Sequence, residues 1–383
     1  MEKIIYILIC HFGLEKVLKS EIKKLGLEIL EVRDGEIMVA GQIKDIPRLN
    51  YNLRTCERVM IEVHKFEAIK PDDLFYNAME AEIEKYVPEE GAFPVTKANQ
   101  DKNSILRSSM ANQKTVKKAF VERLKRIYKK EILSESRGEY PFRVKFYKNI
   151  CSLRLDTTGE SLHKRGYRKI AGVAPIEETL AAALVKLTDL KKDGILIDPF
   201  CGSGTIPIEA AQIVGNIPPG IDRKFISESW DIIEKKYWEE ARLEAKEHID
   251  RERIKMKDIL IYGFDIDGDI LKIAKENAKK AGVEKLIRFD KCDVKDLYNN
   301  DYIKMLKDGI ILTNPPYGER LENKETIIPI YKDLKKSYDN LNSFDMHIIT
   351  PFEDMQKIFG KETRNRKIYN GMIKTYLYSY IKR

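Results

Sequence analysis

Residues 314–318 read Asn-Pro-Pro-Tyr-Gly and directly follow the apolar run Gly309–Thr313. Two consecutive prolines end a strand or a helix, because each lacks a backbone N–H and has a fixed φ. The Asn314 side-chain oxygen and the Pro315 carbonyl can each accept one N–H of an exocyclic aromatic amine, which aims the amine lone pair at an electrophile. The prolines hold both acceptors rigidly, and an aromatic ring can stack on an extruded base. The segment could therefore hold and aim an aromatic amine for attack on an electrophile, and four residues are candidates for catalysis: Asn314, Pro315, Pro316 and Tyr317.

A second chemical motif lies earlier in the chain. Residues 195–211 form an apolar strand, a glycine-rich loop and a helix. Ligands of such units bind at the carboxyl end of the strand, and Gly202 and Gly204 let a ligand approach the backbone closely. The loop is neither a phosphate loop nor a complete dinucleotide fingerprint, so no phosphate group is specifically expected.

Acidic residues also end the next two predicted strands. Asp265, in Tyr-Gly-Phe-Asp-Ile-Asp, is placed to accept both hydroxyls of a ribose, with Ile266 against adenine and Asp267 as a second candidate. Asp293, in Phe-Asp-Lys-Cys-Asp-Val, is placed to accept the adenine amino group. Acids in this order, at the ends of successive strands, could together hold the ribose and the base of a bound nucleoside.

The elements that must position these residues alternate between strand and helix after residue 176. Such alternation, with nearly continuous apolar strands, predicts an α/β domain with a mostly parallel, doubly wound sheet at 176–383. Asp198 and Asp265 are 67 positions apart, and the extra chain around 217–258 reads as an inserted helical arm.

The chain before this domain divides into two smaller α+β regions. Residues 1–65 show a βαββαβ order that suits a ferredoxin-like unit. Asp34-Gly35 predicts a hairpin turn between its second and third strands. Residues 66–162 form a second unit with a helix at 112–130, and residues 163–175 are rich in charge, Gly and Pro, as in a linker.

The positive charge of the chain is confined to its first part. Residues 1–170 hold 33 Lys and Arg against 25 Asp and Glu, whereas residues 171–383 hold 36 of each. A basic region beside a neutral one indicates a polyanion-binding part attached to a catalytic part. The cations and ring expected to contact RNA are Lys114, Lys117, Lys118, Arg123, Lys125, His163, Lys164, Arg165, Tyr167 and Arg168, with Arg126 and Lys130 on the same helix.

Scattered cysteines without a Cys-x-x-Cys pair predict neither a metal site nor a disulfide framework, and they favour a cytoplasmic protein. No apolar stretch approaches the length of a membrane span. His163 has no partner at a metal-ligand spacing.

The motifs together resemble a known family. Asp-Pro-Phe-Cys-Gly-Ser-Gly-Thr at 198–205 resembles the first motif of class I S-adenosylmethionine methyltransferases, and residues 314–317 resemble the fourth motif of those that methylate amino groups. With the segments at 156–168, 174–185, 225–230 and 368–375, the chain resembles the RlmL-type RNA methylases over nearly its whole length. The resemblance implies a ferredoxin-like piece, a THUMP RNA-binding domain and a Rossmann-fold methyltransferase domain. It places Asp198 near the sulfonium of S-adenosylmethionine and the glycines along the methionine moiety. Thr179, Phe200 and Asn314 are also expected in the cofactor site.

The resemblance also implies N2-methylation of guanine in large-subunit ribosomal RNA, with S-adenosylhomocysteine as the product. The same pattern leaves a guanine near the acceptor stem of tRNA open as the alternative. A DNA adenine or protein glutamine methyltransferase fits the basic N-terminal half less well. A non-catalytic assembly factor would be expected to have lost at least one of Asp198, Asp265, Asp293 and Asn314.

Overall fold

The computed structural model describes residues 3–168, 176–251, 254, 260–316, 324–371 and 373–382. The chain divides into two compact units. The first contains residues 1–10, 19–162 and 223–243, and the second contains residues 11–18, 163–222 and 244–383.

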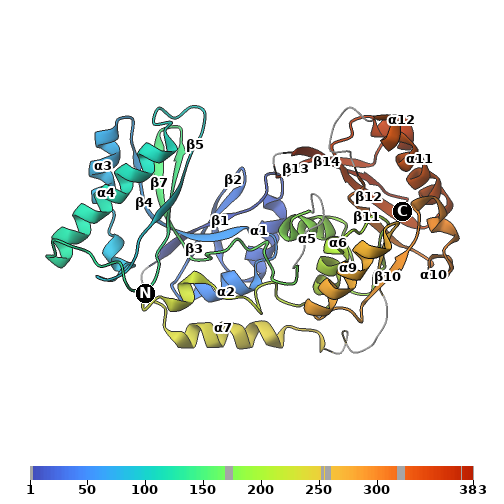
Figure 1. Cartoon of the computed structure of the whole chain (residues 1–383), viewed down its shortest axis with the longest axis horizontal. Coiled ribbons are helices and arrows are strands. Elements are labelled where there is room, and N and C mark those ends of the chain that lie inside the picture. The colour runs from blue at the N-terminus through green and yellow to red at the C-terminus, as the bar shows by residue number, and fades with distance from the viewer. Residues whose placement is uncertain are drawn as a thin grey trace. The chain divides into compact units, whose positions relative to one another are not determined.

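The first unit is built on a seven-stranded sheet with the order β2-β3-β1-β4-β7-β6-β5 (Figure 1). Its neighbouring strands are antiparallel except for β5 and β6. In β6, buried side chains alternate with more accessible ones, whereas β3 and β7 are buried along most of their length. The strands are β1 (Ile4–Ile9), β2 (Glu28–Arg33), β3 (Glu36–Gly41), β4 (Arg58–Glu67), β5 (Val95–Gln100), β6 (Phe142–Tyr147) and β7 (Ile150–Asp156).

The ferredoxin-like fold predicted at the N-terminus is confirmed. The element order is β1, α1 (Glu15–Lys24), β2, β3, α2 (Asp45–Asn52), β4, and the strands pair in the order β2-β3-β1-β4. Gly35 has a φ of 75° and makes the predicted turn between β2 and β3.

The next region continues the same sheet. It contains α3 (Pro71–Met79), the short 3-10 helix η1 (Ile83–Lys85) and α4 (Ser109–Tyr128). Helix α4 begins three residues before the predicted start, because the Ser108 hydroxyl accepts the N–H of Ala111 and caps it. Strand β4 pairs with both β1 and β7, so the sheet runs across the domain boundary predicted at residue 65.

The second unit contains the predicted mostly parallel sheet. Its order is β10-β9-β8-β11-β12-β14-β13, with β14 antiparallel to both of its neighbours. The strands are β8 (Leu196–Asp198), β9 (Ile261–Asp265), β10 (Ile287–Lys291), β11 (Gly309–Thr313), β12 (Phe344–Thr350), β13 (Arg364–Asn370) and β14 (Ile373–Tyr380).

Helices cover both faces of this sheet, as expected for a doubly wound fold. A core cluster that includes Tyr331, Leu334, Phe344 and Met346 lies between the sheet and the helices that follow β11 and β12. The helices are α5 (Glu178–Leu187), α6 (Thr205–Val214), α9 (Gly268–Lys280), the 3-10 helix η3 (Val294–Asn299), α10 (Asp301–Lys304), α11 (Lys324–Asn340) and α12 (Met355–Phe359). Among the described residues, no helix has both the length and the apolar composition needed to cross a bilayer.

The inserted arm contributes to the first unit, although it is inserted between α6 and β9 of the second. The part of the arm that belongs to the first unit, residues 223–243, carries the 3-10 helix η2 (Ile226–Ser229) and most of α7 (Lys235–Glu247). Trp230 is buried, its indole N–H donates to the Glu139 carbonyl at 2.9 Å, and its ring stacks on Tyr140 at 5.0 Å. Residues 252–253 and 255–258 of the predicted arm, the next residue 259, and residues 169–175 of the predicted linker lie outside the described residues.

Removal of the Trp230 ring should destabilise the first unit. Trp230→Ala leaves a cavity beside Tyr140 and removes a buried hydrogen bond, so we expect a loss of about 3–5 kcal/mol in the free energy of unfolding. Trp230→Phe keeps a stacked ring and should lose less. Urea denaturation of both variants measures this difference, and equal stability of Trp230→Ala and the wild type would show that the arm does not stabilise the unit.

Candidate active site

The predicted site residues gather at the carboxyl edge of the second sheet. Asp198 ends β8, Asp265 ends β9, and Asn314 directly follows β11. Asp293 follows β10 two residues after its end. Because the sheet order is β10-β9-β8-β11, these four strand ends adjoin one another. The direction of chain winding reverses between β8 and β11, which is where ligands bind in open α/β sheets.

Asp198 is the buried centre of this edge. Its side chain is removed from water, and one carboxylate oxygen, Oδ1, accepts two hydrogen bonds. The Phe200 backbone N–H donates to it at 3.1 Å and the Thr313 hydroxyl at 2.7 Å. The second bond joins β8 to β11 at the residue before Asn314.

The pKa of Asp198 is raised to about 7, mainly by burial and to a smaller extent by the nearby Asp265 carboxylate. The hydrogen bonds from Thr313 and from the Phe200 N–H act in the opposite direction and lower the pKa. The carboxylate is therefore poised between its neutral and charged forms near neutral pH. A cationic ligand would favour the charged form.

The glycine-rich loop is fixed by the neighbouring strand. The Gly202 N–H donates to Asp265 Oδ2 at 2.9 Å, and the Cys201 N–H donates to the Phe264 carbonyl at 2.9 Å. Gly204 has a φ of 86° at the start of α6, where an added Cβ would lie 3.0 Å from the Phe289 ring. Both glycines stand at positive φ, so the loop conformation itself requires them.

The two acidic candidates after β9 have different roles. Asp267 caps α9 by accepting the N–H groups of Asp269 and Ile270 at 2.8 and 3.4 Å. Asp265 accepts one backbone N–H on each oxygen and keeps further lone pairs for ribose hydroxyls. Ile266 is 63% exposed beside it, so its side chain is available to an adenine ring.

Asp293 begins η3 and has partners in the chain. Its Oδ1 accepts the Lys295 N–H at 3.2 Å, and the Lys295 ammonium lies 3.0 Å from Oδ2. The Lys295 side chain holds the pKa of Asp293 below its usual value. The predicted contact of Asp293 with an adenine amino group stays a prediction.

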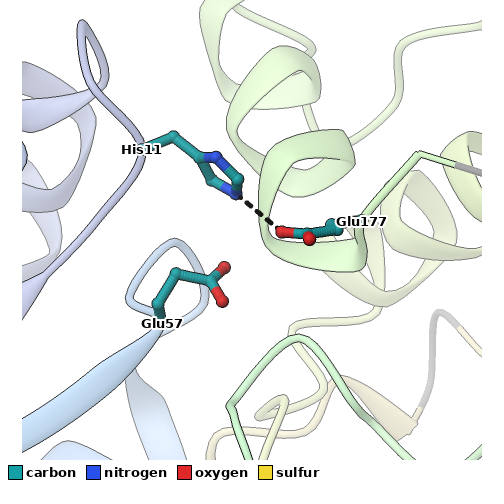
Figure 2. Close-up of side chains that lie close together, drawn as sticks. All are labelled: His11, Glu57 and Glu177. Atoms are coloured by element: carbon teal, nitrogen blue, oxygen red, sulfur yellow. Dashed lines mark ion pairs between the residues drawn. The ribbon is translucent and has the colours of Figure 1, made fainter. Parts of the chain in front are cut away.

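Thr179 is completely buried in the first turn of α5. Its hydroxyl lies 3.5 Å from Nε2 of His11, which also faces the Glu177 carboxylate at 3.2 Å (Figure 2). The start of α5 is therefore in contact with His11, which is more than 160 residues away in the sequence. The predicted place of Thr179 in a cofactor site stays a prediction.

Asn314 carries the most informative atom of the site. Among the described residues, its Oδ1 is buried and has no hydrogen-bond partner. An unpaired buried acceptor costs about 1–3 kcal/mol, and a ligand that brings an N–H donor to this atom would remove that cost. Pro315 is buried and Pro316 is exposed, while Tyr317 lies outside the described residues. Beside a cofactor at Asp198, this arrangement can hold an N–H donor toward an electrophile.

Thr313 is a residue that the sequence analysis did not single out. Its hydroxyl links the predicted cofactor carboxylate to the strand that carries Asn314. The only signal in the sequence was its position directly before the Asn-Pro-Pro segment.

Only some of the cations on α4, the helix predicted to bind RNA, are exposed to solvent. Lys114 and Lys118 are exposed and Lys125 is partly exposed. The Lys117 ammonium pairs with Glu135 at 2.5 Å and lies 3.5 Å from the centre of the Phe93 ring. The prediction for Arg123 is corrected, because this side chain is buried and binds Glu84 through two nitrogens, at 2.5 and 2.6 Å.

The run at 163–168 is corrected in the same way. Arg165 and Tyr167 are buried against Glu209 of α6, at 3.5 and 3.1 Å, and Arg168 donates to Glu178 of α5. Three of its side chains therefore anchor the segment to the second unit. His163 is partly exposed and Lys164 is exposed, so the prediction of RNA contact stays with these two.

Comparisons with known proteins agree with this architecture. Residues 165–379 match the profile of the family described as RMKL-like, methyltransferase domain, and residues 6–60 match that of the RlmL ferredoxin-like domain. The chain is 40% identical to "Putative RNA methyltransferase YpsC" of Bacillus subtilis, over 99% of this chain and 96% of that protein. It is 28% identical to "Ribosomal RNA large subunit methyltransferase K/L" of Psychromonas ingrahamii, over 96% of this chain and 49% of that protein.

The chain thus spans about half the length of the ribosomal RNA relatives that it matches. Among solved structures, it is similar to SMU.472, described as a putative methyltransferase complexed with SAH. The identity is 32%, the TM-score is 0.91, and the match covers 100% of this chain and 99% of that one.

Cofactor affinity should rise with pH through about 7, because the ionised form of Asp198 attracts a cationic sulfonium and its pKa is about 7. Thr313→Val removes a hydrogen bond that lowers this pKa, so the rise should move to higher pH, and Thr313→Ser should restore it. Calorimetric titration with S-adenosylmethionine from pH 5.5 to 8.5 measures the effect. A rise that persists unchanged in Asp198→Asn would belong to another group.

Lysines and Arg123 on α4 should respond differently to substitution. Lys114→Glu with Lys118→Glu should weaken RNA binding and flatten its salt dependence without loss of stability, because both side chains are exposed. Arg123→Ala should instead lower the free energy of unfolding by about 1–3 kcal/mol, since it removes charged hydrogen bonds to Glu84. Filter binding and urea denaturation separate the two effects. Unchanged RNA affinity in the lysine variant would move the RNA-binding surface elsewhere.

Proposed function

Because the chain belongs to the RlmL-like family of methyltransferases, we propose that it methylates the exocyclic N2 amino group of a guanine in 23S ribosomal RNA, with S-adenosylmethionine as cofactor. The observation that carries the proposal is the buried, unpaired Oδ1 of Asn314 beside Asp198. The names of the ribosomal RNA relatives support the substrate, and the SAH complex of a similar chain supports the cofactor.

The cofactor residues of this chain fit S-adenosylmethionine. The glycine-rich loop leaves room for the methionine moiety at Gly202, where an added Cβ would meet nothing within 4 Å. Asp265 offers acceptors for the ribose hydroxyls, and Asp198 offers a carboxylate for the sulfonium end. When bound, the cofactor supplies the electrophilic methyl group.

The chain itself has to orient the amine. Asn314 Oδ1 and the Pro315 carbonyl each accept one N–H, which turns the nitrogen lone pair away from the guanine ring and toward the cofactor side. Pro315 and Pro316 keep both acceptors in place, so the acceptors are already positioned for the amine before the substrate binds. No general base is needed before methyl transfer, because the methylated amine is strongly acidic and then loses its proton to water.

The basic first unit suits the phosphate backbone of RNA. Region 97–130 carries eleven Lys and Arg against two acidic residues, and its exposed lysines supply sequence-independent attraction. A free amino group in folded RNA must also leave its base stack before it reaches Asn314. Binding by the first unit would hold the RNA during that step.

The test is to identify the methylated nucleoside. Purified protein is incubated with labelled S-adenosylmethionine and, separately, with unmodified ribosomal RNA and tRNA, which are then digested. N2-methylguanosine from ribosomal RNA alone is the expected result. The same nucleoside from tRNA alone would transfer the assignment to the acceptor-stem alternative, N6-methyladenosine would overturn the choice of base, and no label in RNA would overturn the proposal.

Asn314→Ala serves as the matched variant in this assay. It should lower turnover by roughly 100-fold, as expected when a reacting group is no longer held in position, with little change in cofactor affinity. Asn314→Asp keeps an acceptor oxygen and should lose less. Equal losses of turnover and cofactor affinity in Asn314→Ala would contradict the role of this residue.

A further inference from the structure

The hairpin formed by β13 and β14 rises from the catalytic edge of the second sheet. Thr313 of β11 is level with Ile348 of β12, and Thr350 of β12 is level with Tyr376 of β14. Strand β14 begins three residues before Tyr376, at Ile373. At about 3.3 Å per residue, the hairpin tip stands roughly 10 Å beyond the end of β12.

The hairpin also lies beside the catalytic strand. In the order β11-β12-β14-β13, its strands are the second and third neighbours of β11. With about 4.8 Å between strands, they lie roughly 10 and 14 Å to the side of β11. A nucleic acid whose target base reaches Asn314 would pass close to the hairpin.

One face of the tip alternates cations and aromatic rings. Lys367 is level with Tyr376 and Tyr369 is level with Lys374, so the four side chains share one face of the hairpin. The Lys367 ammonium lies 5.1 Å from the centre of the Tyr369 ring, and the Lys374 ammonium lies 5.0 Å from the centre of the Tyr376 ring. Both lysines are exposed and both tyrosines are partly exposed. Part of each ring is covered, because Tyr369 lies edge to face on Phe12 at 5.8 Å and Tyr376 packs against the core cluster of this unit.

The charge of this segment is strongly one-sided. Residues 364–383 contain six Lys and Arg and no Asp or Glu. The carboxylate of Glu353 lies 3.8 Å from the Lys374 ammonium, but both groups are exposed, so this pair is weak. Across the described part of the chain, no carboxylate forms an ion pair with Lys367, and Glu362 is bound by Gln356 and Asn365. The lysines thus stay available to an anion.

We propose that the tip of the β13–β14 hairpin is an RNA-binding element of the catalytic unit. Lys367 and Lys374 contact phosphates, and Tyr369 and Tyr376 stack on the unpaired bases beside the target nucleotide. Cations that follow a backbone, together with aromatic platforms for bases, are the means by which proteins bind single strands. Extrusion of the target base leaves its neighbours unstacked. The proposal rests on the proposed methylation of RNA and assigns a second RNA contact, on the catalytic unit itself.

The test compares two double charge reversals in the same unit. Lys367→Glu with Lys374→Glu changes the hairpin. Lys275→Glu with Lys279→Glu makes the same change on exposed residues of α9, toward the opposite edge of the sheet. Unmodified ribosomal RNA is titrated by filter binding at several salt concentrations, while calorimetry with S-adenosylmethionine and the melting temperature report on folding.

The hairpin variant should bind RNA at least ~10-fold more weakly, and the slope of log affinity against log salt should fall by about 1.4, for two single-strand phosphate contacts. Cofactor affinity and melting temperature should match the wild type. The α9 variant should keep its slope. Tyr369→Ala should also weaken RNA binding, and Tyr369→Phe should restore it, because stacking needs the ring and not the hydroxyl.

The outcomes separate this proposal from the proposed function. If the wild type produces N2-methylguanosine in RNA but both double variants bind RNA like the wild type, the hairpin proposal is wrong and the function stands. If the hairpin variant alone loses RNA affinity but the wild type methylates another base, RNA binding by the hairpin is supported and the proposed guanine N2 specificity is wrong. A wild type that binds no RNA would overturn both.

Discussion

The hydroxyl of Thr313 donates to the buried carboxylate of Asp198. This bond joins β11 to β8, the two strands between which the direction of chain winding reverses. Asp198 would be costly to bury alone, since a charged oxygen without partners loses its hydration. The bond from Thr313 and the one from the Phe200 N–H offset part of that cost. They also fix the start of the glycine-rich loop and the residue before Asn314 in one arrangement. The residues proposed to contact the cofactor and those proposed to contact the amine are therefore held by one set of backbone positions.

The same edge shows how a parallel sheet assembles a site from distant parts of the chain. Asp198 and Asn314 are more than a hundred residues apart, but they follow neighbouring strands. Asp265 contributes twice, because it faces the expected ribose position and also accepts the Gly202 N–H from the loop of the next strand. A substitution there would disturb the loop as well as the contact to a ligand. Among the described residues of this edge, the buried oxygen of Asn314 has no hydrogen-bond partner, and this supports its proposed contact with a ligand.

Patterns with a strict backbone requirement were predictable from the sequence. The glycine-rich loop, the Asp34-Gly35 turn and the alternation of strands and helices each follow from local rules, and the structure confirms them. Predictions of exposure failed where a charged residue found a buried partner. Arg123 and Arg165 look like RNA-binding cations in the sequence. In the structure Arg123 pairs with Glu84 and Arg165 with Glu209, and no local sequence pattern predicts these long-range pairs. The hairpin at the end of the chain was recognised only as a family motif, because its alternating lysines and tyrosines become neighbours only once the strand register is known.

The arm at 223–243 has a consequence for the order in which the protein matures. The first unit contains residues on both sides of the stretch 163–222, so its core is incomplete when residue 162 has been synthesised. Until the arm follows, the partner surface of Trp230 on Tyr140 stays uncovered. About 80 more residues must leave the ribosome first, which takes on the order of 4–16 s at roughly 5–20 residues per second. The N-terminal unit therefore completes its fold only after the glycine-rich loop has emerged, and a cut at the sequence boundary between the two halves would leave both of them unfinished.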